Sequence, residues 1–104
     1  MDGLIEGRIV HYVLTDTDAK EISAAHTAAN QTPTAERIPG IQYHAGNSVA
    51  AGEHCPAVIV KVWNKENGYV NLKVLLDGED DYWATSKSYN DGKEPGTWHW
   101  IEKA

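Results

Sequence analysis

The sequence predicts a mainly β protein with one helical insertion (α+β), in which five antiparallel strands form a small, partly open, SH3-like β-barrel. The second half of the chain alternates apolar and polar residues, as strands with one buried face do. Tight-turn pairs, Asn-Gly and Asp-Gly, separate these runs. Residues 16–29 instead space their apolar side chains as a helix does. With 104 residues, the chain is expected to form one domain, 1–104.

The first two elements lie near the N-terminus. A strand is predicted over residues 8–14, a run of β-branched and aromatic side chains that follows a glycine. A helix is predicted over residues 16–29, because Thr15 and the aspartates of the first turn match a helix cap. The apolar stripe of this helix contains Ala19, Ile22, Ala25 and Ala29. Such small side chains pack closely, so we expect the stripe to be a seam in a homo-oligomer.

Regular periodicity fails over residues 30–52, where prolines and glycines interrupt the chain. Connections of about twenty residues without regular structure are uncommon in compact domains and often carry function. We therefore expect part of a binding site in this segment.

Four further strands are predicted over residues 55–63, 69–77, 82–88 and 97–101. In the first of them, Val58, Val60 and Val62 are expected to share one buried face. In the next, the inward side chains are expected to be Val70, Leu72, Val74 and Leu76. Trp63 and Trp83 then lie on the faces opposite these core positions.

The charge balance excludes some partners. Fifteen acidic residues against nine basic ones give a formal net charge of −6. An acidic chain is a poor partner for nucleic-acid polymers and for membrane surfaces, which attract basic proteins. The longest apolar run, residues 57–60, is far too short to cross a bilayer, and the N-terminus has no signal-peptide pattern. We therefore expect a soluble protein of the cytoplasm.

The sequence predicts no catalytic residue, no metal site and no cofactor. The single cysteine, Cys55, follows His54, but neighbouring strand residues point to opposite faces, so the pair is not expected to act as a catalytic dyad. Five histidines are present, and no pair has the i, i+4 spacing of a helical metal site. A metal site assembled across the fold stays open as an alternative.

Six short motifs span nearly the whole chain. They are GRIVHY (7–12), HAGN (44–47), PAVIVKVW (56–63), VNL (70–72), LDG (76–78) and PGTWHW (95–100). Together they resemble a widespread family of small proteins from tailed phages and prophages. The resemblance implies an accessory protein in the host cytoplasm. Shorter relatives pass directly from the first strand to the PAxV strand, which implies that about residues 16–53 are an insertion within the barrel.

The candidate ligand-binding residues are aromatic, basic or amide side chains. They are Arg8, Arg37, Tyr43, His44, Asn47, Trp63, Trp83, Trp98, His99 and Trp100. Aromatic rings stack on planar ligands, the two arginines can hold phosphate, and His44 and Asn47 can contact polar edges. Structural interpretations stay open: Trp98 and Trp100 can fill the barrel, and the arginines can form surface ion pairs.

The phage setting and these residues predict a non-enzymatic protein that binds a small anionic ligand. By analogy of size and setting, the ligand is expected to be a nucleotide-derived immune signal that the protein sequesters, with the pocket enclosed in a homo-oligomer. The alternative is a structural or protein-interaction module, either a minor virion component or an SH3-like adaptor. A hydrolase of nucleotide signals is a third hypothesis.

Overall fold

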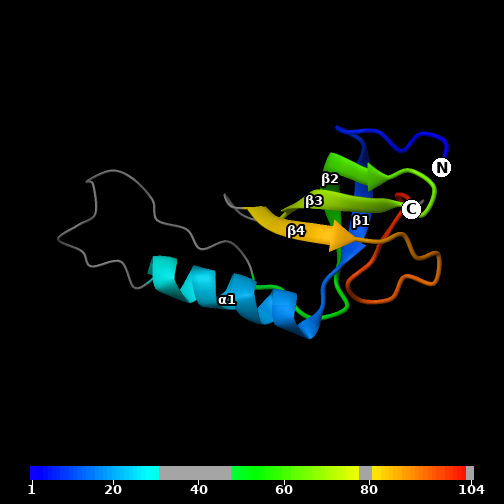
Figure 1. The fold of residues 1–104 in the computed structure, drawn as a ribbon. Coiled ribbons are helices and arrows are strands. Elements are labelled where there is room, and N and C mark those ends of the chain that lie inside the picture. Colours follow the sequence, from blue (N-terminus) through cyan, green and yellow to red (C-terminus); the bar gives the residue numbers. More distant parts are fainter. Residues whose placement is uncertain (31–47, 78–80, 103–104) are drawn as a thin grey trace.

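The computed structural model describes residues 1–30, 48–77 and 81–102. In chain order its elements are β1 (Ile9–Val13), α1 (Asp16–Asn30), β2 (His54–Asn64), β3 (Tyr69–Leu75), β4 (Asp81–Lys87) and β5 (Trp98–His99). The strands form one antiparallel sheet in the order β4-β3-β2-β1-β5. The predicted class, mainly β with one helix, is confirmed. The sheet ends at β4 and β5 and does not close (Figure 1).

The core lies on one face of this sheet. In β3, the side chains of Val70, Leu72 and Val74 are fully buried, as the alternation predicts. Tyr12 of β1 and Trp98 of β5 pair with each other across the two strands and are also fully buried. Burial of these large rings and branched side chains removes the apolar surface that drives folding of a chain this small.

The buried face at the start of β2 is the opposite of the predicted one. Ala57 and Ile59 are fully buried, whereas Val58 is half-buried and Val60 is exposed. Since all four side chains of this run are apolar, alternation could not identify the inward pair. The register decides it, because Ala57 and Ile59 lie opposite buried residues of β3.

A β-bulge returns the second half of β2 to the predicted face. The register shifts between Ile59 and Lys61, so one extra residue lies on the β2 side of the pair. Val62 then lies opposite Val70 and packs against the core. The prediction for Val62 is therefore correct, although the one for Val60 is wrong.

The last strand is shorter than predicted. Residues 97–101 were expected to be extended, but the strand itself covers only Trp98–His99, and before it Gly96 and Thr97 exchange backbone hydrogen bonds with Val13 of β1. Beyond Trp100 the chain folds back over β1, and the Glu102 backbone N–H donates to Nδ1 of His11 at 3.4 Å. This reversal ends the ladder and brings the C-terminal segment over the face opposite the core.

Trp98 joins the end of the sheet to the β2–β3 hairpin. Its Nε1 donates to the backbone oxygen of Gly68 at 2.7 Å, and Gly68 has a φ of 72°, which favours glycine. Its backbone also forms a parallel bridge with Tyr89, just after β4. The predicted Asn-Gly turn is thus part of the structural frame and not only a connection.

Helix α1 begins with the predicted cap. Thr15 Oγ1 accepts the Asp18 N–H at 2.9 Å, and Asp18 Oδ2 accepts the Thr15 N–H at the same distance. Asp18 is buried and accepts two more bonds, from the hydroxyls of Tyr12 (2.5 Å) and Tyr82 (2.9 Å). One carboxylate therefore caps the helix and fastens it to β1 and β4.

Only the first half of α1 is anchored among the described side chains. Ala19 and Ile22 are buried, and Ile22 belongs to the hydrophobic core, whereas Ala25 is exposed. Part of the alanine stripe thus packs within the chain, and its use as an oligomer seam stays a prediction. Within the described residues, this helix is too short and too polar to cross a lipid bilayer.

The ionisation of Asp18 reflects two opposing effects. Burial raises its pKa, but hydrogen bonds from Thr15, Tyr12 and Tyr82 outweigh burial and leave the pKa below its ordinary value. The same contacts have the opposite effect on the Tyr12 phenol. Burial is the larger cause and the Asp18 carboxylate the smaller one, and both raise the pKa of Tyr12. The network therefore favours a charged carboxylate and neutral phenols.

We predict that Asp18→Asn lowers the free energy of unfolding by about 1–3 kcal/mol near neutral pH, because its hydrogen bonds then end on a neutral amide. The folded-state pKa lies below the unfolded value of about 3.9, so this stability is present above that value and is lost as the pH falls through the folded-state pKa. Urea unfolding across this pH range measures the difference. Asp16→Asn, which removes an exposed partner of Lys20, is the control and should have little effect. A difference that persists unchanged in acid would contradict the prediction.

Candidate metal centre

Three strands place a histidine on the sheet face opposite the core. In β1, His11 lies between the buried residues Val10 and Tyr12. In β2, His54 precedes the buried Cys55, and in β5, His99 follows the buried Trp98. Because side chains alternate along a strand, burying these neighbours turns all three imidazoles to the other face. The order β2-β1-β5 then places the three strands side by side.

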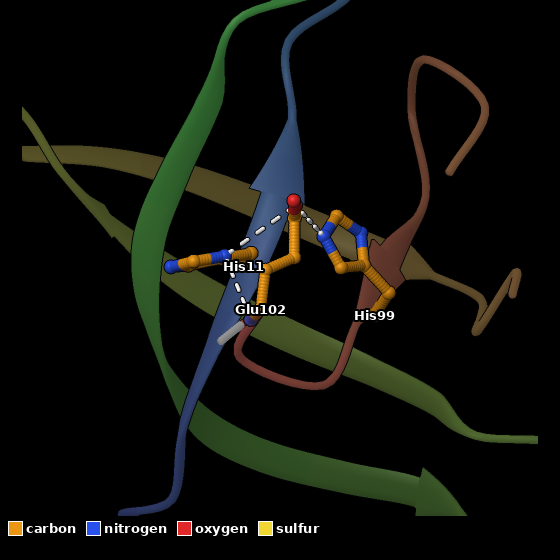
Figure 2. A group of neighbouring side chains, drawn as sticks. All are labelled: His11, His99 and Glu102. Atoms are coloured by element: carbon orange, nitrogen blue, oxygen red, sulfur yellow. Dashed lines mark hydrogen bonds and ion pairs between the residues drawn. The ribbon is translucent and has the colours of Figure 1, made fainter. Parts of the chain in front are cut away.

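Glu102 completes the cluster from the C-terminal segment. Its Oε1 accepts bonds from Nε2 of His99 at 2.5 Å and from Nδ1 of His54, and it lies 3.6 Å from Nδ1 of His11 (Figure 2). The rings of His11 and His54 meet the His99 ring edge-on, at centroid separations of 5.7 and 5.0 Å. One carboxylate oxygen thus contacts ring nitrogens from three different strands.

The cluster is enclosed at its base and open toward solvent. The His99 side chain is 3% exposed, while those of His11, His54 and Glu102 are 23–34% exposed. Hydrogen bonds from His54 and His99 lower the pKa of the Glu102 carboxyl to about 2, so this group is charged at neutral pH. Its second oxygen, Oε2, lies 3.8 Å from the ammonium of Lys93.

Donor atoms suited to a metal ion gather in this cluster. Those of His11, His99 and Glu102 all lie within 4.8 Å of one another. Around zinc, ligand atoms at bond lengths of about 2.0–2.2 Å are about 3.3–3.6 Å apart, so Glu102 Oε1, now 2.5 Å from His99 Nε2, has to move away from that nitrogen for an ion to enter. His54 lies against the same Glu102 oxygen and can serve as a fourth donor.

The predicted ligand-binding residues are dispersed. Arg37, Tyr43, His44 and Asn47 lie outside the described residues. Of the others, His99 alone belongs to the cluster of histidines around Glu102.

Trp98 and Trp100 fit the structural interpretation of the aromatic triplet. Trp98 is fully buried, so neither face of its indole is free to stack on a ligand. Trp100 packs edge-on against Trp98 at 5.0 Å, and the Arg8 guanidinium lies over the Trp100 ring at 5.4 Å. His99, predicted as a ligand-binding residue, is buried and bonds the Glu102 carboxylate.

Trp63 and Trp83 are exposed on the outer face, by 58% and 59%. The Trp63 indole donates to Asn71 Oδ1 at 3.0 Å and has the Lys61 ammonium over its ring at 5.1 Å. Trp83 lies opposite Lys73 of β3. These two rings keep the accessible surface that the stacking prediction requires, but they lie apart from the histidine cluster along the sheet.

Sequence reasoning missed His11, His54 and Glu102 as partners of His99. The search for spacing within one element could not find them, because each belongs to a different part of the chain. The available signal was the position of each histidine next to an apolar or aromatic residue in a predicted strand or directly before one. Its use would have required knowing that the first strand lies between the β2 and β5 strands.

We predict that Cys55 is unreactive in the folded protein. Burial, and then the charge of Glu53, raise the pKa of the Cys55 thiol to about 11, so little thiolate exists at neutral pH. Iodoacetamide labelling followed by mass spectrometry should therefore be slower by at least about tenfold in buffer than in denaturant. Equal rates in the two conditions would show that the thiol is accessible and would reopen a nucleophilic role.

Comparison with family models, with curated proteins and with solved structures found no match to this chain. The resemblance to tailed-phage proteins therefore stays a prediction. The function has to be inferred from the geometry of the site itself.

Proposed function

We propose that the protein binds a transition-metal ion of the zinc class through His11, His54, His99 and Glu102. The observation that carries this proposal is the position of Glu102 Oε1, which contacts a ring nitrogen of each of three histidines. These groups come from three strands and the C-terminal segment, so the fold itself assembles the donor set.

The donor chemistry selects the class of ion. Imidazole nitrogens suit zinc, copper, nickel and iron, whereas magnesium and calcium prefer oxygen donors. Three imidazoles and one carboxylate match the four-coordinate sets that zinc takes in proteins. Zinc is therefore the expected ion, and cobalt(II) can serve as its spectroscopic substitute.

A cation also explains the cluster better than ion pairing alone. If the three histidines were protonated, like charges would be held together around one carboxylate, and Lys93 would add another. If they were neutral, one carboxylate oxygen would serve several donors at once. A divalent ion would take one nitrogen lone pair from each ring and neutralise the carboxylate, while the buried Nδ1 of His99 would still have no hydrogen-bond partner among the described residues.

The finer fold assignment, an SH3-like arrangement, is part of the proposal. The strand order supports it, and so does the parallel bridge between Tyr89 and Trp98, which brings the segment after β4 beside β5. Full barrel closure is not required for such a domain.

A second candidate function is sequestration of a small anionic, nucleotide-derived ligand by a non-enzymatic phage accessory protein in the host cytoplasm. The exposed indoles of Trp63 and Trp83 favour it, because exposed rings stack on planar ligands. The same rings fit a protein partner, which keeps the structural or interaction module as the alternative.

We predict that the metal-free protein binds one zinc ion per chain. Titration calorimetry after chelator dialysis, with metal content measured by elemental analysis, tests this. His11→Asn, His54→Asn and Glu102→Gln should each weaken binding by about 100-fold or more, since each removes a donor from a four-donor set. His26→Gln, in the second half of α1, is the matched control and should bind as the parent does.

Zinc should also stabilise the folded chain, because it joins β1, β2, β5 and the C-terminal segment. At a free zinc concentration 100 times Kd, the free energy of unfolding should rise by about 2.7 kcal/mol. This gain should vanish in Glu102→Gln, which keeps the size of a half-buried side chain that lies outside the sheet. Zinc binding that is equally weak in the parent and in all three variants would refute the metal site.

For the second candidate, we predict that incubation with a panel of nucleotides yields a complex that native mass spectrometry detects. Trp63→Ala and Trp83→Ala should weaken this complex, and Ile101→Ala, which removes an exposed aliphatic side chain, is the control. Heating should release the nucleotide unchanged. Release of a cleaved nucleotide would indicate an enzyme, and no binding across the panel would favour the interaction module.

A further inference from the structure

We infer that the metal ion at this centre keeps a coordination position for a ligand from solvent, and that the ligand is a small oxyanion, a phosphate group above all. This inference rests on the proposed metal site. It extends that proposal from binding of the ion to binding of an oxyanion by the ion.

The donor side chains are accessible to solvent on one side of the centre. Three of the four side chains, those of His11, His54 and Glu102, are 23–34% exposed, so solvent reaches one side of the centre. The fourth, His99, is almost completely buried and closes the other side. An ion bound at this centre would be exposed to water on the side away from His99. Zinc sometimes expands its coordination to five ligands.

The chain brings three donors close together and a fourth beside them. The donor atoms of His11, His99 and Glu102 form the group within 4.8 Å, and His54 joins through its contact with Glu102 Oε1. Three-donor sites of two histidines and one carboxylate keep a water or substrate in the remaining position. With His54 bound as well, the exposed side still allows expansion to five ligands.

The centre with its ion would carry a local positive charge. A divalent ion with neutral imidazoles and one carboxylate leaves a local charge of about +1, in a chain whose formal net charge is −6. The Lys93 ammonium, 3.8 Å from Glu102 Oε2, adds a second positive charge at the edge of the centre. The site therefore supplies the local positive potential that an anionic ligand of an acidic protein requires.

The geometry of a phosphate group also suits this centre. A phosphate group carries several oxygens, so one can bind the metal while another accepts from the Lys93 ammonium. Free phosphate and the phosphate of a nucleotide share this chemistry. Ile9, two residues before His11 on the same face of β1, is exposed and could contact only the larger ligand.

The test uses the full chain loaded with cobalt(II), whose visible absorption reports on its ligands. Inorganic phosphate should change the spectrum in a saturable manner, and adenosine monophosphate should do the same. Tighter binding of the nucleotide would identify a nucleotide as the source of the phosphate, and equal binding would identify free phosphate. Cobalt content is measured after each titration, so that extraction of the ion is not mistaken for binding.

The decisive variant is Lys93→Asn. Lys93 has a φ of 59°, a left-handed conformation that asparagine tolerates, so this change removes the ammonium without straining the backbone. It should weaken phosphate binding by about two- to fivefold, as expected for one exposed ionic contact, while cobalt affinity changes little. Lys73→Gln is the matched control, since it removes an equal charge that pairs with Asp81 on β4.

The outcomes separate the two proposals. If no cobalt binds, the metal site and this inference both fail. If cobalt binds but saturating phosphate leaves the spectrum unchanged, the centre is closed and structural, and only this inference fails. If Lys93→Asn and Lys73→Gln weaken phosphate binding equally, the assigned role of Lys93 is wrong and the oxyanion is held by the metal alone.

Discussion

The pairing of Tyr12 with Trp98 across β1 and β5 is the contact on which the other features depend. Both residues are fully buried, and each also donates a side-chain hydrogen bond to another element of the fold. The Tyr12 hydroxyl donates to Asp18 at the start of α1, and Trp98 Nε1 donates to Gly68 in the β2–β3 turn. These two paired residues therefore connect the helix, the edge strand and the hairpin, and their buried polar atoms are hydrogen-bonded at the same time.

The same pairing determines where the histidines lie. Side chains alternate across a strand, so burying Tyr12 and Trp98 turns their neighbours His11 and His99 to the opposite face, directly across from each other. His54 follows from the same rule, since Cys55 beside it lies opposite Tyr12 in the register. The candidate metal centre is thus a consequence of core packing: the strands that build the core also fix three donors behind it.

The sequence predicted the elements well and the candidate site poorly, for physical reasons that can be named. Strand composition, alternation, turn pairs and the helix cap are local signals, and they identified all the strands of the described residues and the Thr15 cap of the helix. The inward face of β2 was misassigned because residues 57–60 are all apolar and only pairing with β3 distinguishes them. The cluster depends on strand order and on the chain reversal after Trp100, which no local pattern encodes. Trp98 was also hard to assign from the sequence, because an indole can either stack on a ligand or fill the hydrophobic core, and Trp98 is fully buried.

The four proposed donors differ in how firmly the fold holds them, and this difference bears on function. The histidines stand on hydrogen-bonded strands, and His99 is enclosed almost completely. Glu102 follows the last strand, and its side chain accepts bonds from His54 and His99. Its backbone has one long bond to His11, and its second carboxylate oxygen lies 3.8 Å from the Lys93 ammonium. Rigid imidazoles favour one ion size and one coordination geometry. A carboxylate that lies outside the sheet can either bind the ion or leave its coordination position to another ligand. Exchange at the proposed centre would therefore depend on Glu102, which is the one of the four donors that lies outside the sheet.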